Sequence, residues 1–255
     1  LQHLAQQEDP FYRAIKQFQP FGRVLDLNQD QENFNINQDR NVKTDKVEGK
    51  LDYYFILSPK SNLNLTLGVT DVRQDFDSSI FQILDNNTTE NFNENNLINR
   101  VNFRFQDVYT ALHYRFIKGI FTFDPGVTLH YYKTTTDQLN GIVSDSYSFF
   151  RPDFRVLMKL KESETLRLIF RSTRQFTDIN NLAKGFIFRN YNSFFRGNPN
   201  LEAAFFNVVN LNYQSINIFN FTNIFANLSY SRRDNAIQNT TAVQGINSVI
   251  SSGIT

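Results

Sequence analysis

The sequence predicts an all-β fold: a segment of an antiparallel, up-and-down transmembrane β-barrel with short turns at one rim and long loops at the other. Three observations predict it. Apolar residues recur at every second position along strand-length segments, as in sheets with one apolar and one polar face. Short turns alternate with long Asn-rich loops, as in a meander. Aromatic residues make up 15% of the chain although its mean hydropathy is −0.42, and a barrel accommodates both by facing lipid.

The composition excludes several other classes. No segment approaches the roughly 18 consecutive apolar residues of a membrane-spanning helix, so insertion into a membrane would use strands closed by hydrogen bonds. The chain has no cysteine, which excludes disulfides and thiolate metal sites. A formal net charge of +1 argues against a nucleic-acid partner.

The N-terminal part of the chain has the weakest pattern. Residues 1–46 are rich in Asn, Gln and Asp, and we expect a loop or a weak strand there. The first regular hairpin is predicted over about 47–57 and 62–70, with a turn at 58–61. A long loop over 71–97 follows, and its apolar residues indicate that it is folded.

The next strand, over about 98–116, changes the phase of its alternation. Its apolar residues occupy odd positions up to Phe105 and even positions from Val108. Such a switch within one strand predicts a β-bulge near Gln106 and Asp107.

The strand that returns, over about 121–131, has its apolar residues at odd positions. Pairing Phe116 with Phe121 across the turn 117–120 places both apolar sets on one face. Pro125 removes one ladder hydrogen bond, and we expect a second bulge around it. A loop of medium length, 134–146, leads to the next strand.

That strand and its partner form a hairpin with a basic polar face, joined by a turn at 161–163. A three-residue turn sets Asp153 opposite Arg171 and avoids two arginines facing each other. The basic residues form a charge ladder that could attract anionic ligands in a lumen. Alternatively, they pair with acids on neighbouring strands or on a segment that fills the barrel. The ladder consists of Arg155, Lys159, Arg167 and Arg171, with Asp153 among them.

A loop over about 175–199 precedes the last regular hairpin, which has a turn near 216–220. The tally is about eight strands over 47–235, which we assign to the barrel segment. Residues 236–255 are expected to start a further long loop.

The three histidines, His3, His113 and His130, offer little chemistry. The predicted register sets His113 opposite Asp124 and His130 opposite Asp107, and cross-strand pairs of this kind are common. Two histidines on separate rungs without a third ligand make a poor metal site, and no Ser–His–Asp arrangement can be argued. We therefore expect no cofactor, no metal and no enzymatic activity.

Tyrosines near strand ends have two interpretations. They could form aromatic girdles at the membrane interfaces, or they could be ordinary strand residues. The candidates are Tyr53, Tyr131, Tyr132 and Tyr230.

Two segments carry a resemblance to a known family. The first runs from Arg171 to Leu182, and the second reads Gly-Asn-Pro-Asn-Leu-Glu over 197–202. A strand ending in Arg and Thr, a loop that reaches a Leu, and this second motif opening a strand resemble TonB-dependent receptors. The Bacteroidetes outer-membrane β-barrel branch, whose members often carry an upstream carboxypeptidase-like regulatory domain, is the most similar. The motif residues are Arg174, Leu182, Gly197, Asn198, Pro199, Leu201 and Glu202.

Turn chemistry favours a structural role for the second motif. Gly197 would be free to take a positive φ, and Pro199 would fix the exit from the turn. Direct contact with a ligand is the alternative.

The resemblance implies a place in the bacterial outer membrane, in contact with its lipid. Members of the family resemble one another in a barrel of about 22 strands closed by a plug, and they import bulky ligands with energy passed on by TonB. This chain has no recognisable plug or energy-coupling box and too few strands, so we expect it to be an internal piece of a longer protein. The four short turns would then lie at the periplasmic rim and the long loops outside.

Three functions remain open. The first is a segment of a receptor-like barrel that binds and imports a bulky ligand, recognised mainly by the loops 71–97 and 175–199. The second is a receptor-like barrel that transports nothing and serves as a scaffold for other outer-membrane subunits. The third is a secreted, soluble β-sandwich binding module, which predicts that Phe55, Leu65, Phe123 and Leu168 share one buried core.

Overall fold

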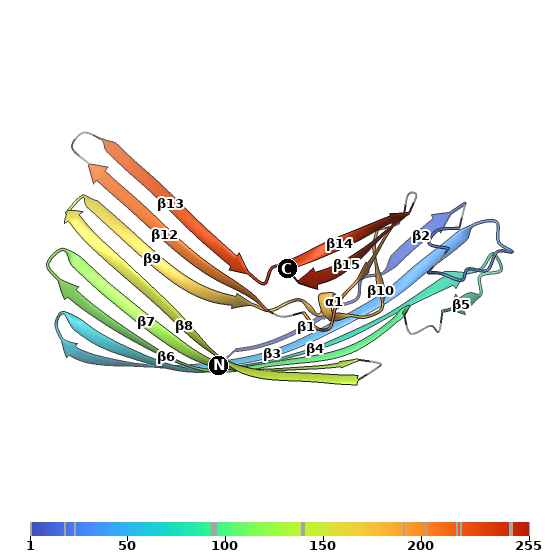
Figure 1. Cartoon of the computed structure of the whole chain (residues 1–255), viewed down its shortest axis with the longest axis horizontal. Coiled ribbons are helices and arrows are strands. Elements are labelled where there is room, and N and C mark those ends of the chain that lie inside the picture. Colours follow the sequence, from blue (N-terminus) through green and yellow to red (C-terminus); the bar gives the residue numbers. More distant parts are fainter. Residues whose placement is uncertain are drawn as a thin grey trace.

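The computed structural model describes residues 2–254 except 18, 23, 93–95, 139–140, 191, 202, 218, 220 and 245–246. Its larger sheet has the order β1-β3-β4-β6-β7-β8-β9-β12-β13, with antiparallel pairing throughout. Strands adjacent in the sheet follow one another along the chain apart from short intervening elements, so the sheet is an up-and-down meander that curves as an arc (Figure 1).

Long strands dominate the described part of the chain. They are β3 (Phe34–Ser58), β4 (Ser61–Ile83), β6 (Ile98–Lys118), β7 (Phe121–Gln138), β8 (Gly141–Lys161), β9 (Glu164–Gln175), β12 (Ala204–Asn217) and β13 (Thr222–Asp234). This set matches the predicted tally. The shorter elements are β1 (Gln2–Glu8), β2 (Tyr12–Lys16), β5 (Thr89–Asn91), α1 (Ile179–Leu182), β10 (Phe186–Asn190), β11 (Ser193–Arg196), β14 (Ile237–Gln244) and β15 (Asn247–Ile254). Among the described residues, no helix has the length and apolar character needed to cross a membrane.

Residues 1–46 contribute strands, where we expected a loop or a weak strand. β1 and β2 lie end to end along β3 in one register, because Gln2 pairs with Glu48 and Tyr12 pairs with Gln38. The two strands are separated around Pro10, which has no N–H to donate to the ladder. The first half of β3 completes this region.

Two predicted loops are largely strand. β4 continues to Ile83, so the expected loop 71–97 shrinks to 84–97 with β5 inside it. β7 and β8 likewise extend to Gln138 and from Gly141, which removes the expected loop 134–146. These stretches looked like loops because polar residues occupy the face that is apolar nearer the short turns.

The predicted bulge at Gln106–Asp107 is wrong. Pairing of β6 with β4 and with β7 runs through both residues without a shift. Odd positions of β6 face one side of the sheet throughout: Val101 and Phe103 are buried there, whereas Val108 is exposed on the other side. The apolar residues change face along a regular strand because the surroundings of the two faces change.

The β6–β7 hairpin is tighter than predicted. Phe116 pairs with Phe123, two residues from the expected partner, and Lys118 pairs with Phe121 across a turn in which Gly119 has φ +58°. A shift of two residues preserves the face. Around Pro125 the ladder lacks pairs but resumes in the same register, so the second bulge is also wrong.

The β8–β9 hairpin confirms the pairing of Asp153 with Arg171, and its turn carries a register shift between Lys159 and Lys161. The turn expected near 216–220 falls between β12 and β13, although 218 and 220 lie outside the described residues. β14 and β15 pair with each other in the stretch where a loop was expected to begin, and residues 245 and 246 between them lie outside the described residues.

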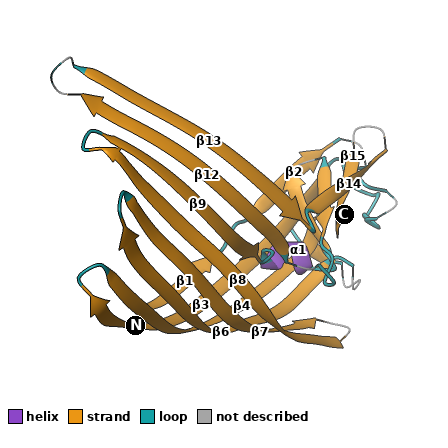
Figure 2. Ribbon diagram, turned by 60° about the vertical axis from the view of Figure 1, so that its left-hand side comes forward, coloured by secondary structure: helices purple, strands orange, loops and turns teal. Residues whose placement is uncertain are grey.

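A second sheet, with the order β10-β11-β15-β14, covers part of one side of the larger sheet together with α1 (Figures 1 and 2). We call that side the inner face. Two buried clusters join the layers there. In the first, Ile80 packs with Phe188 and Phe194, and in the second, Phe76 packs with Leu182 and Phe195. The core therefore lies at the end of the sheet away from the short turns.

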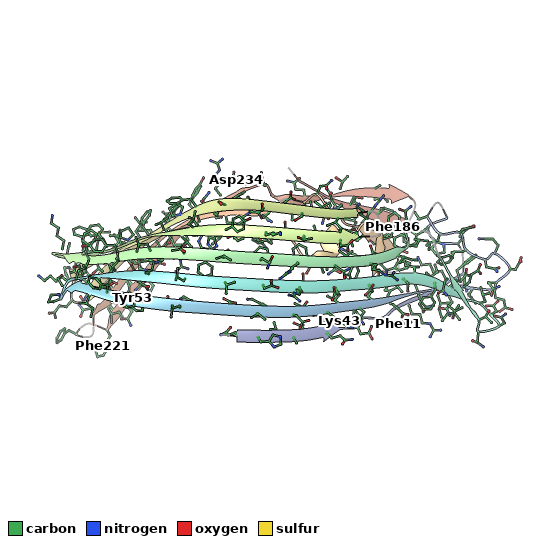
Figure 3. All side chains as sticks on the ribbon, turned by 90° about the horizontal axis from the view of Figure 1, so that it is seen from below. Phe11, Lys43, Tyr53, Phe186, Phe221 and Asp234 are labelled. Carbon is green, nitrogen blue, oxygen red and sulfur yellow. The ribbon has the colours of Figure 1, made fainter. Side chains whose placement is uncertain are left out.

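The opposite side, the outer face, carries an apolar band near the short turns. Figure 3 shows Tyr53 toward the short-turn end of β3 and Lys43 farther along it. Leu51, Phe55 and Leu65 are 66%, 50% and 37% exposed. Phe123 and Leu168 fall on the same face by register, through Val156. These residues share no buried core, which excludes the sandwich. Apolar residues that are cross-strand partners on this face form a continuous surface, which is typical of a lipid-facing barrel wall.

Three of the four girdle candidates, Tyr53, Tyr131 and Tyr230, are exposed on the outer face. Tyr132 contradicts the girdle interpretation, because it lies on the inner face and is only 4% exposed.

Candidate ligand-binding surface on the inner face

Behind the apolar band, the inner face carries many polar side chains, with a few apolar residues such as Leu157 and Ile169 among them. One cross-strand row contains Asn64, His113, Gly126, Asp153 and Arg171 in successive strands. The residues of the outer face paired next to this row are apolar, for example Leu63 and Phe154. This inside-polar, outside-apolar arrangement is that of a barrel wall with an aqueous lumen.

His113 contacts Asp153, with its Nε2 3.2 Å from Oδ2, and does not meet the expected Asp124. The register explains the error, because His113 pairs with Gly126. A Cβ on Gly126 would lie 2.1 Å from Cδ2 of His113. The imidazole therefore lies across the glycine and reaches the carboxylate on the strand beyond it.

His130 does contact Asp107, as predicted, with its Nδ1 3.0 Å from the carboxylate. The two residues are diagonal neighbours, because the register pairs His130 with Tyr109. The buried imidazole stacks on Tyr132 with 5.0 Å between ring centroids. No cluster of three His, Cys, Asp or Glu side chains suited to a metal occurs in the described part of the chain.

The basic ladder falls on the inner face, in register with Asp153. Arg155 and Lys159 of β8 and Arg167 and Arg171 of β9 are all exposed there. Arg155 lies 3.9 Å from the carboxylate of Asp124, an exposed contact of little energy. The ladder therefore presents net positive charge to the lumen.

A cavity of about 710 Å³ opens on the inner face beyond the apolar band. The first half of β8, from Val143 to Phe149, forms one wall with Phe103, Thr134 and Thr136 of the strands beside it, and described residues between Arg174 and Phe205 form the other. Four residues of the sequence motif line it: Arg174, Leu182, Pro199 and Leu201. Glu202 lies outside the described residues.

Arg174 joins the two walls. Its guanidinium carbon lies 3.8 Å from the ring centre of Tyr147 and 4.7 Å from that of Phe205. The rings of Phe149 and Phe176 lie at 6.0 and 5.6 Å. A planar cation against several aromatic faces gains cation–π energy from each. Sequence reasoning missed these rings, although Tyr147 and Phe149 occupy the inner phase of their strand.

The Gly197 motif packs the backbone of the 174–205 wall. The N–H of Gly197 donates to the carbonyl of Ala183 at 2.8 Å, and the N–H of Asn198 donates to the carbonyl of Asn181 at 2.7 Å. A Cβ on Gly197 would lie 2.4 Å from the Asn181 carbonyl oxygen. The positive φ values of the described glycines belong to Gly119 and Gly141. Close backbone approach, and not the expected positive φ, therefore requires this glycine.

The nearby turn satisfies its own polar groups. Asn198 Oδ1 accepts a hydrogen bond from the Asn200 N–H at 2.9 Å. Asp178 caps α1 by accepting from the Asn180 N–H at 2.8 Å. The motif is thus a folded connection that places Leu182 and Leu201 against the cavity.

Several solved structures share this fold at low sequence identity. The copper transporter OprC has a TM-score of 0.58 at 10% identity, over 99% of this chain and 38% of its own. The hemophore receptor HasR of Serratia marcescens, in complex with its hemophore HasA and heme, has a TM-score of 0.58 at 11% identity, over 99% of this chain and 44% of its own. The FpvAI–pyocin S2 complex has a TM-score of 0.56 at 10% identity, over 98% and 33%. The chain thus spans between a third and a half of these structures.

No curated protein matches the sequence. At this level of identity, the likeness to these solved structures shows a shared fold. The model of the outer membrane protein beta-barrel family matches residues 18–252. Because that match covers most of the sequence, this chain belongs to the outer membrane protein beta-barrel family.

Proposed function

We propose that this chain forms part of the wall of a TonB-dependent receptor-like barrel that binds a bulky ligand at the cell surface and imports it. The observation that supports import is the inner face. It carries polar and basic side chains behind a lipid-facing band, and a cavity of about 710 Å³ lies on it at the end away from the short turns. A ligand entering from outside would meet the cavity first and the basic ladder next. The plug and its contact with TonB would come from other parts of the protein.

Ligand recognition would use the same two segments that the sequence indicated, the first of them shortened. Most of 71–97 is strand, so recognition would come from 84–97 and above all from 174–205, which lines the cavity. The ladder from Arg155 to Arg171 would attract anionic groups along the lumen. In this role the chain binds and conducts a ligand and performs no catalysis.

Uptake by cells that express the full-length protein tests the proposal. Deletion should abolish uptake of one class among iron chelates, cobalamin, oligosaccharides and oligopeptides, and a protonophore should do the same. A double variant, Arg155→Gln with Arg171→Gln, should slow uptake of an anionic ligand, whereas Arg73→Gln on the outer face should not. Unchanged uptake of every class after deletion would overturn import.

One observation favours the second function, a scaffold that transports nothing. The second sheet and α1 are joined to the inner face by two buried clusters, so the outer end of the lumen is partly filled. Purification of the full-length protein decides between the two. A stable complex with other outer-membrane subunits, together with absent uptake, would support the scaffold.

A further inference from the structure

The ladder between β8 and β9 ends partway along β8, and we call the place where the two backbones separate the opening. Their ladder ends at the pair Asp153–Arg171, yet β8 continues back to Gly141. Along 141–152 the described strands pair with β8 only through β7. β9 instead follows β12 up to the pair Gln175–Ala204. Figure 1 shows the β7–β8 hairpin diverging from β9 and β12.

The backbone groups at this open edge can be assigned. The N–H of Lys159 donates to the carbonyl of Ile120, the residue just before β7, at 2.9 Å. Because backbone direction alternates along a strand, odd positions of β8 turn toward β7 and even positions turn away. Ser144, Ser146 and Ser148 therefore direct N–H and C=O groups toward the opening, and all three residues are exposed. An unpaired edge of this kind is a template for another strand.

The cavity lies beside that edge. Val143, Tyr147 and Phe149 line it from β8, and Phe176 and Leu201 line it from the opposite wall. A strand added to the edge would send alternate side chains toward this partly apolar space. The edge begins where the outer face of β8 changes from apolar to polar. On that face, Phe150 is followed in the direction of Gly141 by Ser148 and Ser146. It is thus open to water, where an unpaired edge is tolerated.

We propose that the edge of β8 over 142–150 and the adjoining cavity bind an extended peptide by strand addition. The added strand continues the β8–β9 ladder from the point where β9 leaves it. Backbone hydrogen bonds supply the binding, and apolar side chains at alternate positions enter the cavity. About six to nine residues, at roughly 3.3 Å each, span the edge. The inference deepens the proposed function, on which it rests for the import of what is bound, by naming extended peptides as the ligand class.

Binding is tested on the full-length protein in detergent, without any transport step. The probe is a fluorescein-labelled peptide, acetyl-Lys-Thr-Leu-Thr-Phe-Thr-Leu-Thr-Lys-amide, followed by fluorescence anisotropy. Two further peptides carry N-methyl groups on either the Thr positions or the Leu and Phe positions. Each set of N-methyl groups removes the N–H donors along one edge of the peptide strand, and only one edge of the peptide pairs with β8. One methylated peptide should therefore bind like the parent, and the other should bind about tenfold or more weakly.

Two protein variants test the edge itself. Ser146→Pro removes an N–H that faces the opening but leaves the β7 ladder intact, since that ladder uses odd positions. Ser146→Ala is the matched control and keeps the N–H. The proline variant should bind the probe about tenfold more weakly, and the alanine variant should match the unmodified protein. Heat-modifiable migration in gels confirms that each barrel is folded.

A measurement on the unmodified protein covers the case in which the proline variant fails to fold. Bound peptide should slow hydrogen exchange at the amides of Ser144, Ser146 and Ser148. Absence of saturable binding up to about 1 mM, or equal binding by both N-methylated peptides, would overturn the proposal. Self-association of the protein through this edge that the peptide does not disrupt would overturn it as well. If the protein binds the peptide but cells that express it take up no peptide, the result would count against import and not against binding.

Discussion

At the scale of single residues, glycines mark the places where two parts of the molecule approach most closely. Gly68 and Gly126 lie under the rings of Tyr109 and His113, and a Cβ at either would lie 2.1 Å from the ring. Such aromatic coverage of a strand glycine pins register. Gly197 differs, because the atoms that it meets belong to the backbone and cannot turn away.

Substitution of Gly197 tests that difference. Gly197→Ala places a methyl group 2.4 Å from the Asn181 carbonyl oxygen, and relieving the overlap must displace α1 or the turn. We expect a cost of about 1–3 kcal/mol, seen as a lower melting temperature and faster proteolysis of 176–203. Gly22→Ala is the control, since its nearest neighbour is the flexible end of Gln19 at 3.3 Å. Equal effects of the two substitutions would contradict this explanation.

A carboxylate above the apolar band predicts a dependence on pH. Burial disfavours ionisation of Asp71, but hydrogen bonds from Arg104 at 2.7 Å and Gln106 at 2.8 Å outweigh it and lower the pKa of the carboxyl group. A lowered pKa in the folded state stabilises the fold at pH values above the unfolded pKa of about 3.9, and this contribution is lost as pH falls through the folded pKa.

The measurement is the melting temperature between pH 7 and pH 3. Asp71→Asn should lower the melting temperature at neutral pH, and the difference from the unmodified protein should shrink as pH falls below about 4. Asp75→Asn, the same chemical change on the same face of β4, is the control. A difference for Asp71→Asn that is independent of pH would refute the ionic origin of the stabilisation.

At the scale of elements, the strands near the short turns could be predicted because lipid on one face and a lumen on the other impose strict alternation. Leu63 to Val69 follow that rule, whereas Tyr53 to Leu57 depart from it with an apolar or aromatic residue at every position. The same strands continue beyond the band, where the outer face carries Asp71, Arg73 and Asp75. Those residues read as a loop because the apolar positions there, Phe76 and Ile80, belong to the opposite face.

The candidate site shows the same limit of sequence reasoning. The motif residues were found, and four of them line one cavity. Their partners, Tyr147 and Phe149, come from β8, and only the separation of β8 from β9 brings Arg174 against them. No periodicity within a strand reports where two strands separate.

Arg174 should therefore hold residues 141–150 of β8 in place. Arg174→Lys keeps the charge but loses the planar group that lies against Tyr147 and Phe205. We expect faster hydrogen exchange over 141–150, with exchange in the β9–β12 ladder unchanged. Arg171→Lys, an exposed inner-face position three residues earlier, is the matched control. Unaltered exchange over 141–150 would mean that other contacts hold this hairpin.

At the scale of the whole molecule, the change of apolar face along each strand marks the level at which the wall leaves the membrane. On β4 it falls between Val69, which is exposed on the outer face, and Asp71. On β13, at the far end of the arc, it falls between Tyr230 and Arg232. Below this level an outer-face residue meets lipid, and above it the same face meets water. The inner face shows the reverse, because the second sheet buries its apolar residues only above this level.

Because the chain contains no tryptophan, single Trp substitutions in the reconstituted full-length protein can read this level directly. Trp at Leu65, Phe123 or Leu168 should be quenched by brominated lipid. Trp at Arg73, on the same face of β4 but above the boundary, should resist lipid and yield to aqueous iodide. Trp at Asn64, one residue from Leu65 but on the inner face, should also resist lipid. Equal quenching at 64 and 65 would contradict a wall with one lipid face, and lipid quenching at 73 would move the boundary beyond Asp71. The level fixed in this way also decides whether the open edge of β8 is reachable from water, since that edge begins just above it.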